Sequence, residues 1–591
     1  MSGFSAPHCG SLRASDNGRT VDLYGWVGRR RDHGGLTFLD LRDRWGSVQV
    51  VFNPEHAPGA HAAAAELRAE FVVKVKGEVH LRPEGMRNPQ LPTGEVEVVA
   101  EDVEVLSESV TPPFQIEEAT SAGTEEKTRL SYRYLDLRRP RMLEILELRH
   151  RVSKIIHAYM DENEFIEVET PILSKTSPSG ARDFLVPSRL HPGQVYALPQ
   201  APQVPKQLLM VAGIQRYYQI ARCFRDENLR ADRQPEFTQL DIEMSFGDEE
   251  DVFQLIEGLF ARLWKETIGV ELSLPFPRLD IREALLRYGS DKPDLRYELE
   301  IAELGPVLSR TEARVFRGVL DSGGVIRGLA VPGGRDMSRR ELDELTVIAR
   351  GAGGKGLAWL PGGPLDKFLT PAEVTGIQQA TGAGDGDLVL IAADRRRRAE
   401  TVMGLIRSEV ARRRGLIRRG EWPFLWIHPT YLFDEDDEGR LTYAHHPFVR
   451  PVAADMKFVE ERPYDVRAHA YDIVCNGHEL GGGSLRIYDP ALQERVFKLL
   501  GMPQETIQER FGYLLEAFRY GVPPHGGIAW GVDRVVMMLA GTENIRDVIA
   551  FPKTQSMADL MMDAPSAPDP ELVKELGVTF APRGTSRESG R

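Results

Sequence analysis

Apolar and polar residues alternate in five short stretches within the first hundred residues of the chain. The stretches are TVDLYGWV, GLTFLDL, SVQVVF, FVVKVKGEV and GEVEVVA, and Gly, Asp, Asn or Pro residues separate them. Alternation with a period of two is typical of β-strands that bury one face. Five such strands predict a small closed β-barrel of the OB type over residues 1–106, a fold that often binds oligonucleotides.

The pattern changes after the barrel. Residues 107–140 are polar and irregular, which predicts a linker. Strand and helix patterns then mix over 141–288 and again over 424–565. Between them, residues 289–423 carry Gly-rich pieces around an α/β pattern and an Arg-rich helix. We therefore expect an α+β multidomain protein with an inserted domain at 289–423 and a tail at 566–591. The first helix after the linker is predicted from apolar residues at helical spacing, namely Leu143, Leu146, Val152, Ile155, Ile156 and Tyr159.

Composition narrows the class of protein. The 591 residues have a net charge of −14, which argues against a general nucleic-acid binder but leaves a specific RNA ligand open. No apolar run reaches about 18 residues, so no membrane span is expected. The N-terminus lacks the pattern of a signal peptide. The three cysteines (Cys9, Cys223, Cys475) match no zinc spacing, which predicts a reducing, cytoplasmic location.

Three segments carry residues suited to chemistry. EFIEVETPILSKTSPSGARDF has Pro171 breaking a strand. ARCFRDENLRADRQPEFTQLDIEMSF places Arg225, Glu227 and Phe237 on two strands and a charged loop. GGIAWGVDRVVMML puts Arg534 at the start of an apolar helix. Glycine-flanked strands and an arginine at a helix start suit a bound polyphosphate.

These segments resemble, in order, motifs 1, 2 and 3 of the class II aminoacyl-tRNA synthetases. The strings YALPQAPQVPKQLLMVAG, AHHPF and AYDIVCNGHELGGGSLRIYD are similar to the aspartyl members, and the insertion resembles the extra domain of the bacterial ones. The resemblance implies ATP-dependent ligation of L-aspartate to tRNA(Asp) through an aspartyl-adenylate. It also implies Mg²⁺ and a homodimer built on motif 1. An aspartate carboxylate is ionised at pH 7, so it needs alignment and charge cancellation rather than a general base.

The resemblance also assigns residue roles. Arg225, Glu479 and Arg534 are the expected catalytic residues, and Asp472 and Glu479 the expected Mg²⁺ ligands. Asp533 is expected to cap the helix that follows it. The expected ATP-binding residues are Arg225, Asp226, Glu227, Gln234, Phe237, Glu479, Gly531, Asp533 and Arg534. The expected aspartate-binding residues are Ser179, Gln203, Lys206, Arg225, Gln239, Asp241, His445, His446 and Arg486.

The sequence departs from the aspartyl pattern around this site. Ser179 stands where relatives commonly have glutamate, Ala201 where they have serine, and Pro205 where they have an aromatic residue. Pro205 requires a helix that starts nearby. We expect a raised KM for aspartate that Ser179→Glu lowers.

The barrel holds the expected tRNA contacts. Arg31, Phe38 and Gln49 match positions that grip the anticodon. His33 resembles the residue of enzymes that also charge tRNA(Asn). The competing interpretations are a core position for Phe38, a plain loop for His445 and His446, an asparaginyl or lysyl relative, and a silent RNA-binding paralogue.

Overall fold

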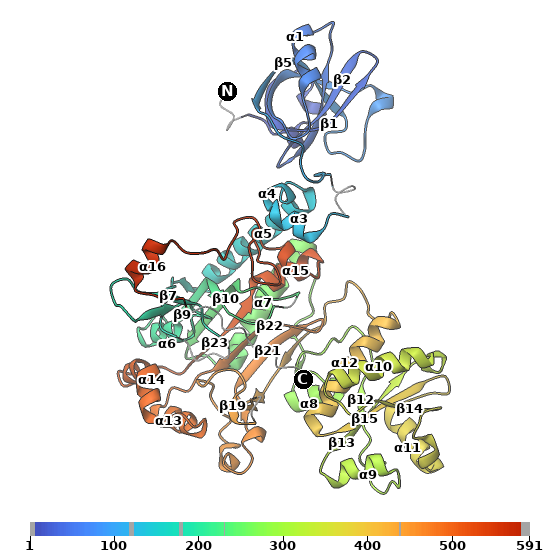
Figure 1. Ribbon diagram of the computed structural model, residues 1–591, viewed down its shortest axis with the longest axis vertical. Coiled ribbons are helices and arrows are strands. Elements are labelled where there is room, and N and C mark those ends of the chain that lie inside the picture. Colours follow the sequence, from blue (N-terminus) through green and yellow to red (C-terminus); the bar gives the residue numbers. More distant parts are fainter. Residues whose placement is uncertain (1–5, 118–122, 177–180, 230, 437–438, 581–591) are drawn as a thin grey trace. The chain divides into compact units, whose positions relative to one another are not determined.

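The protein consists of two compact units (Figure 1). We use a computed structural model that describes residues 6–117, 123–176, 181–229, 231–436 and 439–580. One unit comprises Met1–Glu147 with Arg546–Ser566, and the other Leu148–Ile545 with Ala567–Arg591. The predicted inserted domain shares the second unit with most of the segments 141–288 and 424–565 that flank it.

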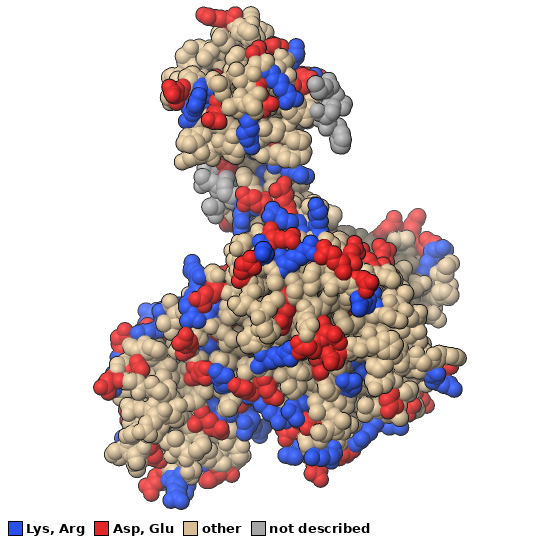
Figure 2. All heavy atoms as spheres, turned by 180° about the vertical axis from the view of Figure 1, so that it is seen from behind, with Lys and Arg blue, Asp and Glu red and all other residues tan. Residues whose placement is uncertain are grey.

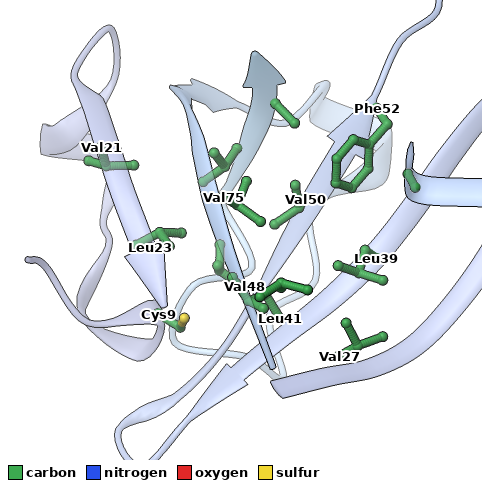
Figure 3. Close-up of a cluster of buried hydrophobic side chains, with 14 of the residues drawn as sticks. Cys9, Val21, Leu23, Val27, Leu39, Leu41, Val48, Val50, Phe52 and Val75 are labelled. Atoms are coloured by element: carbon green, nitrogen blue, oxygen red, sulfur yellow. The ribbon is translucent and has the colours of Figure 1, made fainter. Parts of the chain in front are cut away.

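The first unit contains the predicted barrel, which closes in the strand order β1-β2-β3-β5-β4. Alternate residues of each strand point inward, and Val21, Leu23, Leu39, Val50 and Val75 fill the interior (Figure 3). The OB architecture expected from the alternation is therefore confirmed. The barrel elements are β1 (Thr20–His33), β2 (Leu36–Asp43), β3 (Gly46–Phe52), α1 (Pro58–Glu66), β4 (Val72–Leu81) and β5 (Val96–Ser107).

The segment after the barrel is only partly irregular. Residues 108–117 have no helix or strand, as the sequence predicts, but two short helices, α3 (Glu126–Ser131) and α4 (Arg133–Asp136), lie in the C-terminal part of the predicted linker. Buried Arg133 stabilises them by donating hydrogen bonds to the carbonyl oxygens of Arg546, Ile549 and Ala550. This tertiary contact joins residues 546–566 to the first unit. The helix predicted from residue 141 is present as α5 (Pro140–Glu162).

The second unit is built on an eight-stranded sheet in the order β11-β16-β21-β22-β23-β10-β9-β6. Neighbouring strands are antiparallel except for the two edge pairs, β11 with β16 and β6 with β9. In Figure 1 the green strands β9 and β10 lie beside the orange strands β21 to β23. The strands are β6 (Ile166–Glu167), β9 (Arg216–Phe224), β10 (Glu236–Ser245), β11 (Arg278–Leu279), β16 (Phe424–Ile427), β21 (Ala470–Cys475), β22 (His478–Leu485) and β23 (His525–Gly531).

Helices and hairpins surround this sheet. The ring of Phe260 on α7 packs 5.3 Å from that of Trp530 on β23, so α7 covers one sheet face. The helices are α6 (Gln203–Val211), α7 (Glu249–Ile268), α8 (Ile281–Tyr288), α13 (Pro490–Leu499), α14 (Gln504–Phe518), α15 (Val532–Ala540) and α16 (Pro570–Leu576). The hairpins pair β7 (Leu185–Pro187) with β8 (Val195–Ala197) and β18 (Phe433–Glu435) with β19 (Leu441–Tyr443), and β17 (Thr430–Tyr431) pairs with β20 (Arg467–Ala468) in a further two-stranded sheet.

The inserted segment forms a four-stranded sheet with helices on both faces. One hydrophobic cluster joins the sheet to α10 and α12, and a second joins its other face to α9 and α11. The elements are β12 (Ile301–Glu303), α9 (Arg314–Asp321), β13 (Val325–Val331), α10 (Arg339–Gly351), β14 (Ala358–Leu360), α11 (Pro371–Thr381), β15 (Leu388–Asp394) and α12 (Arg396–Arg413).

The surface carries charged side chains of both signs. Lysine and arginine side chains are interspersed with aspartate and glutamate on the face of each unit drawn in Figure 2. No helix within the described ranges has the length and apolar character to cross a membrane.

Candidate active site

A cavity of about 500 Å³ opens on the central sheet of the second unit. Its walls come from α6, from strands β10, β21, β22 and β23, and from the start of α15. Period-two alternation turns Phe237, Gln239 and Asp241 of β10 to the cavity, while Leu240 and Ile242 at alternate positions are buried apolar residues. Small residues of β22 and β23, including Gly481, Gly482 and Gly483, leave room for a ligand.

Two buried cations and two buried carboxylates form one end of the cavity. Lys206 Nζ lies 2.8 Å from Asp241 Oδ1 and 3.3 Å from Glu243 Oε2. Arg486 donates from Nε and Nη2 to the two oxygens of Glu243, each at 2.9 Å. This bidentate pair fixes the guanidinium plane. Asp241 accepts from Lys206 through Oδ1, which leaves Oδ2 for another donor.

The protonation states of this quartet follow from its geometry. Burial opposes ionisation of Glu243, but the charges of Arg486 and Lys206 outweigh burial and lower its pKa to about 2. Arg486 also donates from Nη1 to Nε2 of His446 at 2.8 Å. Burial and the charge of Arg486 hold the pKa of His446 well below 6.5, so its ring is neutral and can accept this bond. His446 is therefore part of the site rather than of a plain loop.

The opposite end of the cavity suits a nucleotide. The Arg225 guanidinium lies 5.0 Å from the centre of the Phe237 ring. Arg534, near the start of α15, contacts the carbonyl oxygen of Glu479, and its Nη2 lies 3.2 Å from Asp232 Oδ2. An aromatic ring with a guanidinium beside it is a surface on which a base can stack.

Asp533 does not cap α15, contrary to the sequence prediction. Gly531 occupies the N-cap position and makes no side-chain cap. Asp533 instead accepts from the backbone N–H of Thr238 at 2.7 Å and from Arg149 at 2.5 Å. It therefore fixes the start of α15 to β10, an arrangement that sequence spacing does not reveal.

Two carboxylates, Asp472 and Glu479, face the cavity from β21 and β22. A β-bulge between Ile473 and Val474 shifts the register of this pair. Glu479 is three residues from Gly482, the partner of Asp472, and would otherwise face the opposite side of the sheet. Burial, and after it the charges of Glu479 and Asp291, raise the pKa of Asp472 well above its usual range.

This pair fits a hard cation. Asp472 is buried, and its Oδ1 has no hydrogen-bond partner in the described parts of the chain. A Cβ on Gly482 would lie 2.5 Å from this oxygen and 3.9 Å from Glu479 Oε1, so only glycine leaves the space open. Among the described residues, no three His, Cys, Asp or Glu side chains could hold a metal by themselves. Mg²⁺ commonly takes one or two carboxylates and completes its shell with phosphate and water.

The cavity brings together nearly all of the predicted residues of the catalytic site. Asp226 is the exception, because it faces Arg182 at 3.9 Å instead of lining the cavity. Ser179 lies outside the described residues. Pro205 is in the first turn of α6, where proline is tolerated. The predicted residues that line the cavity are Gln203, Lys206, Arg225, Glu227, Gln234, Phe237, Gln239, Asp241, His445, His446, Asp472, Glu479, Arg486, Gly531, Asp533 and Arg534.

The predicted anticodon residues lie together on the outside of the barrel. Phe38 is half-buried and pairs across β1–β2 with Arg31, while its neighbours Thr37 and Leu39 are buried. Arg31 donates to Asp40 at 2.9 Å, and its Nη2 lies 3.5 Å from the side-chain oxygen of Gln49. Phe38 is therefore not a core residue. His33 is exposed at the end of β1.

Sequence reasoning missed two residues of the site. Glu243 anchors both Arg486 and Lys206 but is two positions beyond the predicted Asp241, on the same face of β10. The alternation of Gln239, Asp241 and Glu243 could have revealed it, since a buried strand face with three polar residues must pair them. Asp291 lines the cavity from the start of the inserted segment, and no local pattern signals that position.

Family models match both parts of the chain. Residues 125–555 match the tRNA synthetases class II (D, K and N), and residues 21–106 match the OB-fold nucleic acid binding domain. Two solved structures share the fold. They are an asparaginyl-tRNA synthetase from Pyrococcus horikoshii (TM-score 0.59, 19% identity, 93% of this chain and 98% of that one) and a putative aspartyl-tRNA synthetase from Leishmania major (0.56, 18%, 93% of each).

Curated relatives match over nearly the whole chain. The aspartate--tRNA(Asp/Asn) ligase of Syntrophomonas wolfei is 52% identical over 95% of this chain and 97% of its own length. The ligases of the same name from Moorella thermoacetica and Bacillus subtilis are 51% and 49% identical, over 100% and 97% of this chain and 98% of each relative. The chain therefore belongs to the class II tRNA synthetases, among the aspartate--tRNA ligases.

Proposed function

We propose that the protein activates L-aspartate with ATP and transfers it from aspartyl-adenylate to tRNA(Asp) and also to tRNA(Asn). The buried pair of cations, Lys206 and Arg486, carries the choice of amino acid. Both line the cavity and are held in place by Glu243. A side-chain carboxylate entering the cavity would meet two cations whose positions are already fixed, and their positive charge favours it.

The same geometry argues against the asparaginyl and lysyl alternatives. An asparagine side chain would bring an NH₂ group against the donors of Lys206 and Arg486 and leave buried groups unpaired. A lysine side chain would add a third cation to the same wall. Asp241, with Oδ2 free of Lys206, together with Gln239 is suited to hold the substrate ammonium group.

The other end of the cavity supports activation by ATP. Arg225 lines the cavity with its guanidinium 5.0 Å from the centre of the Phe237 ring, which supports a role in bridging the amino-acid carboxylate and the α-phosphate. Phe237 and Arg534 provide faces for adenine. Mg²⁺, held by Asp472 and Glu479, would neutralise phosphate charge as pyrophosphate leaves. The presence of Arg225, Glu479 and Arg534 in one cavity argues against a silent RNA-binding paralogue.

The outer face of the barrel supports tRNA binding. Arg31, Phe38 and Gln49 combine a cation, an aromatic ring and an amide on one surface, as single-stranded RNA recognition requires. His33 is exposed at the tip of the adjoining hairpin, where it can meet the third anticodon base. Three relatives near half identity are named as ligases for both tRNA(Asp) and tRNA(Asn), which supports the wider tRNA choice.

A homodimer and a cytoplasmic location complete the proposal. Edge strand β6 and the segment after it expose Ile166, Ile172 and Leu173 in a single copy of the chain. An apolar sheet edge of this kind is suited to a second copy. All three cysteines are free thiols, as expected for a reducing compartment.

Charging of two transcripts tests the function. The purified protein is given ATP and radiolabelled aspartate with tRNA(Asp) or tRNA(Asn). Charging of both transcripts supports the whole proposal, and charging of tRNA(Asp) alone removes the role of His33. Aspartate-dependent exchange of pyrophosphate into ATP measures activation separately, and its absence would overturn the assignment of aspartate. Ser179→Glu, measured in the same exchange, is expected to lower the KM for aspartate.

A further inference from the structure

Asp291 is a carboxylate that the inserted domain presents to the nucleotide end of the cavity. It lines the cavity together with Asp472, Glu479 and His445. Its side chain is 55% exposed and lies 3.4 Å from the ammonium group of the neighbouring Lys292. Asp291 is thus accessible to water at the site rather than buried in a structural ion pair.

The inserted domain fixes the segment that carries Asp291. Gly289 and Gly404 of α12 approach so closely that a Cβ on Gly404 would lie 2.2 Å from the Gly289 carbonyl oxygen. Gly289 also has φ +65°, a conformation that favours glycine. The segment therefore leaves α8 by a sharp turn held directly against α12.

Arg407 of α12 fixes the far end of the same segment. This buried arginine donates to the carbonyl oxygen of Asp294 at 2.9 Å and to that of Leu299 at 2.5 Å, with a longer bond of 3.3 Å to Tyr297. Residues 289–299 are thus attached to one helix of the inserted domain at both ends. The position of Asp291 depends on that attachment.

A separate observation concerns a carboxylate oxygen at this end of the cavity that has room in front of it for a ligand. Asp472 Oδ1 is buried and has no hydrogen-bond partner in the described segments, and Gly482 keeps the space before it open. Asp472 and Glu479 supply only two carboxylates, so most of the shell of a bound Mg²⁺ would be phosphate and water. Water molecules bound to that ion would donate hydrogen bonds and therefore need acceptors nearby. Asp291 is a further carboxylate that lines the same cavity and can accept them.

We propose that Asp291 is a positioning residue of the metal–ATP site, supplied by the inserted domain, and that it accepts hydrogen bonds from water molecules bound to the metal held by Asp472 and Glu479. This inference rests on the proposed function of the cavity. It gives the inserted domain a part in ATP binding. Acceptors around a metal's direct ligands commonly contribute about 10- to 100-fold to metal affinity.

Metal binding by the full chain tests this inference. Mn²⁺ is titrated into the protein in the presence of ATP, and free Mn²⁺ is followed by electron paramagnetic resonance. We expect Asp291→Asn to weaken Mn²⁺ binding about tenfold, and Asp291→Glu to restore part of the loss. Asp385→Asn is the matched control, because it removes the same charge from an exposed loop of the inserted domain. Asp385 does not line the cavity, so its variant should bind Mn²⁺ as the unaltered protein does.

The Mg²⁺ dependence of pyrophosphate exchange separates this role from a structural one. For Asp291→Asn we expect the half-saturating Mg²⁺ concentration to rise and the rate to recover at high Mg²⁺. A lower plateau with an unchanged Mg²⁺ midpoint, or unchanged Mn²⁺ affinity, would overturn the role of Asp291. If the unaltered protein showed no aspartate-dependent pyrophosphate exchange, the proposed function would be contradicted instead. The Mn²⁺ titration would still test the role of Asp291 in that case.

Discussion

At the scale of single residues, the site depends on groups that hold other groups in place. Glu243 fixes Arg486 by two hydrogen bonds and also faces Lys206, while Asp533 connects α15 to Thr238 of β10. Removing one member of a buried ion pair leaves its partner uncompensated, which costs more than losing an exposed pair. Substitutions behind the cavity should therefore affect stability as well as activity.

Glu243→Gln is expected to destabilise the second unit in a pH-dependent way. A fall of the Glu243 pKa from 4.5 to about 2 corresponds to about 3 kcal/mol of stability at neutral pH. Because the folded-state pKa is lowered, this stability is present above pH 4.5 and is lost as the pH falls toward 2. Urea unfolding should show a constant difference from the unaltered protein between about pH 5.5 and 8 that narrows below 4.5.

The control for this prediction is an exposed glutamate. Glu271 pairs with Lys265 at the surface, so Glu271→Gln should change stability by less than about 1 kcal/mol at every pH. Equal effects of the two substitutions would contradict the assigned role of Glu243.

Phe237→Ala is expected to weaken ATP binding. Stacking of a base on an aromatic ring contributes about 1–3 kcal/mol, so the KM for ATP should rise roughly 5- to 150-fold in pyrophosphate exchange. Phe237→Tyr keeps the ring and should remain within a few-fold of the unaltered protein. A normal KM for ATP in Phe237→Ala would show that adenine binds elsewhere.

At the scale of elements, the alternation of side chains along a strand turns every second residue to the site, and a β-bulge changes which residues face it. Strand β10 turns Phe237, Gln239 and Asp241 to one face, whereas the bulge on β21–β22 is needed to bring Glu479 to that face. Strand β6 has a different role, because it ends the sheet and exposes apolar residues beside it.

Ile172→Arg is expected to convert a dimer into monomers. Two-fold symmetry places the substitution twice in one interface, and a buried unpaired charge is unfavourable there. Sedimentation velocity at micromolar protein should show the change of mass. Val347→Arg places the same charge on an exposed position of the inserted domain and should leave the dimer intact. A dimer in both variants would place the interface away from β6.

At the scale of the whole molecule, the two units divide the proposed reaction. Every residue proposed to bind aspartate or ATP that the structure describes belongs to the second unit, whereas Arg31, Phe38 and Gln49 belong to the first. Changes in the first unit should therefore affect tRNA recognition and leave the activation of aspartate intact, and changes in the cavity should affect activation.

Deletion of residues 1–106 tests this division. Pyrophosphate exchange should persist, since none of the described residues in that range lines the cavity. The KM for tRNA should rise at least about tenfold, equivalent to ~1.4 kcal/mol of lost binding. Circular dichroism and exchange activity establish that the shortened protein folds. An unchanged KM for tRNA would mean that the barrel does not bind the anticodon.

The sequence alone determined the features that repeat locally. Alternation predicted the barrel, helical spacing predicted α5, and the motif residues Arg225, Glu479 and Arg534 predicted the site that the cavity unites. Such signals are readable because strand and helix periods depend on neighbours only a few residues apart.

Only the tertiary structure decided the features that depend on distant contacts. It showed Asp533 bound to Thr238 instead of capping its helix, Asp226 turned to Arg182, and α3 and α4 within the C-terminal part of the predicted linker. It also brought Glu243 to Arg486 and Asp291 to the cavity. Each of these positions is set by a contact with a residue from another part of the chain. The local spacing of residues in the sequence does not reveal which distant residues come into contact.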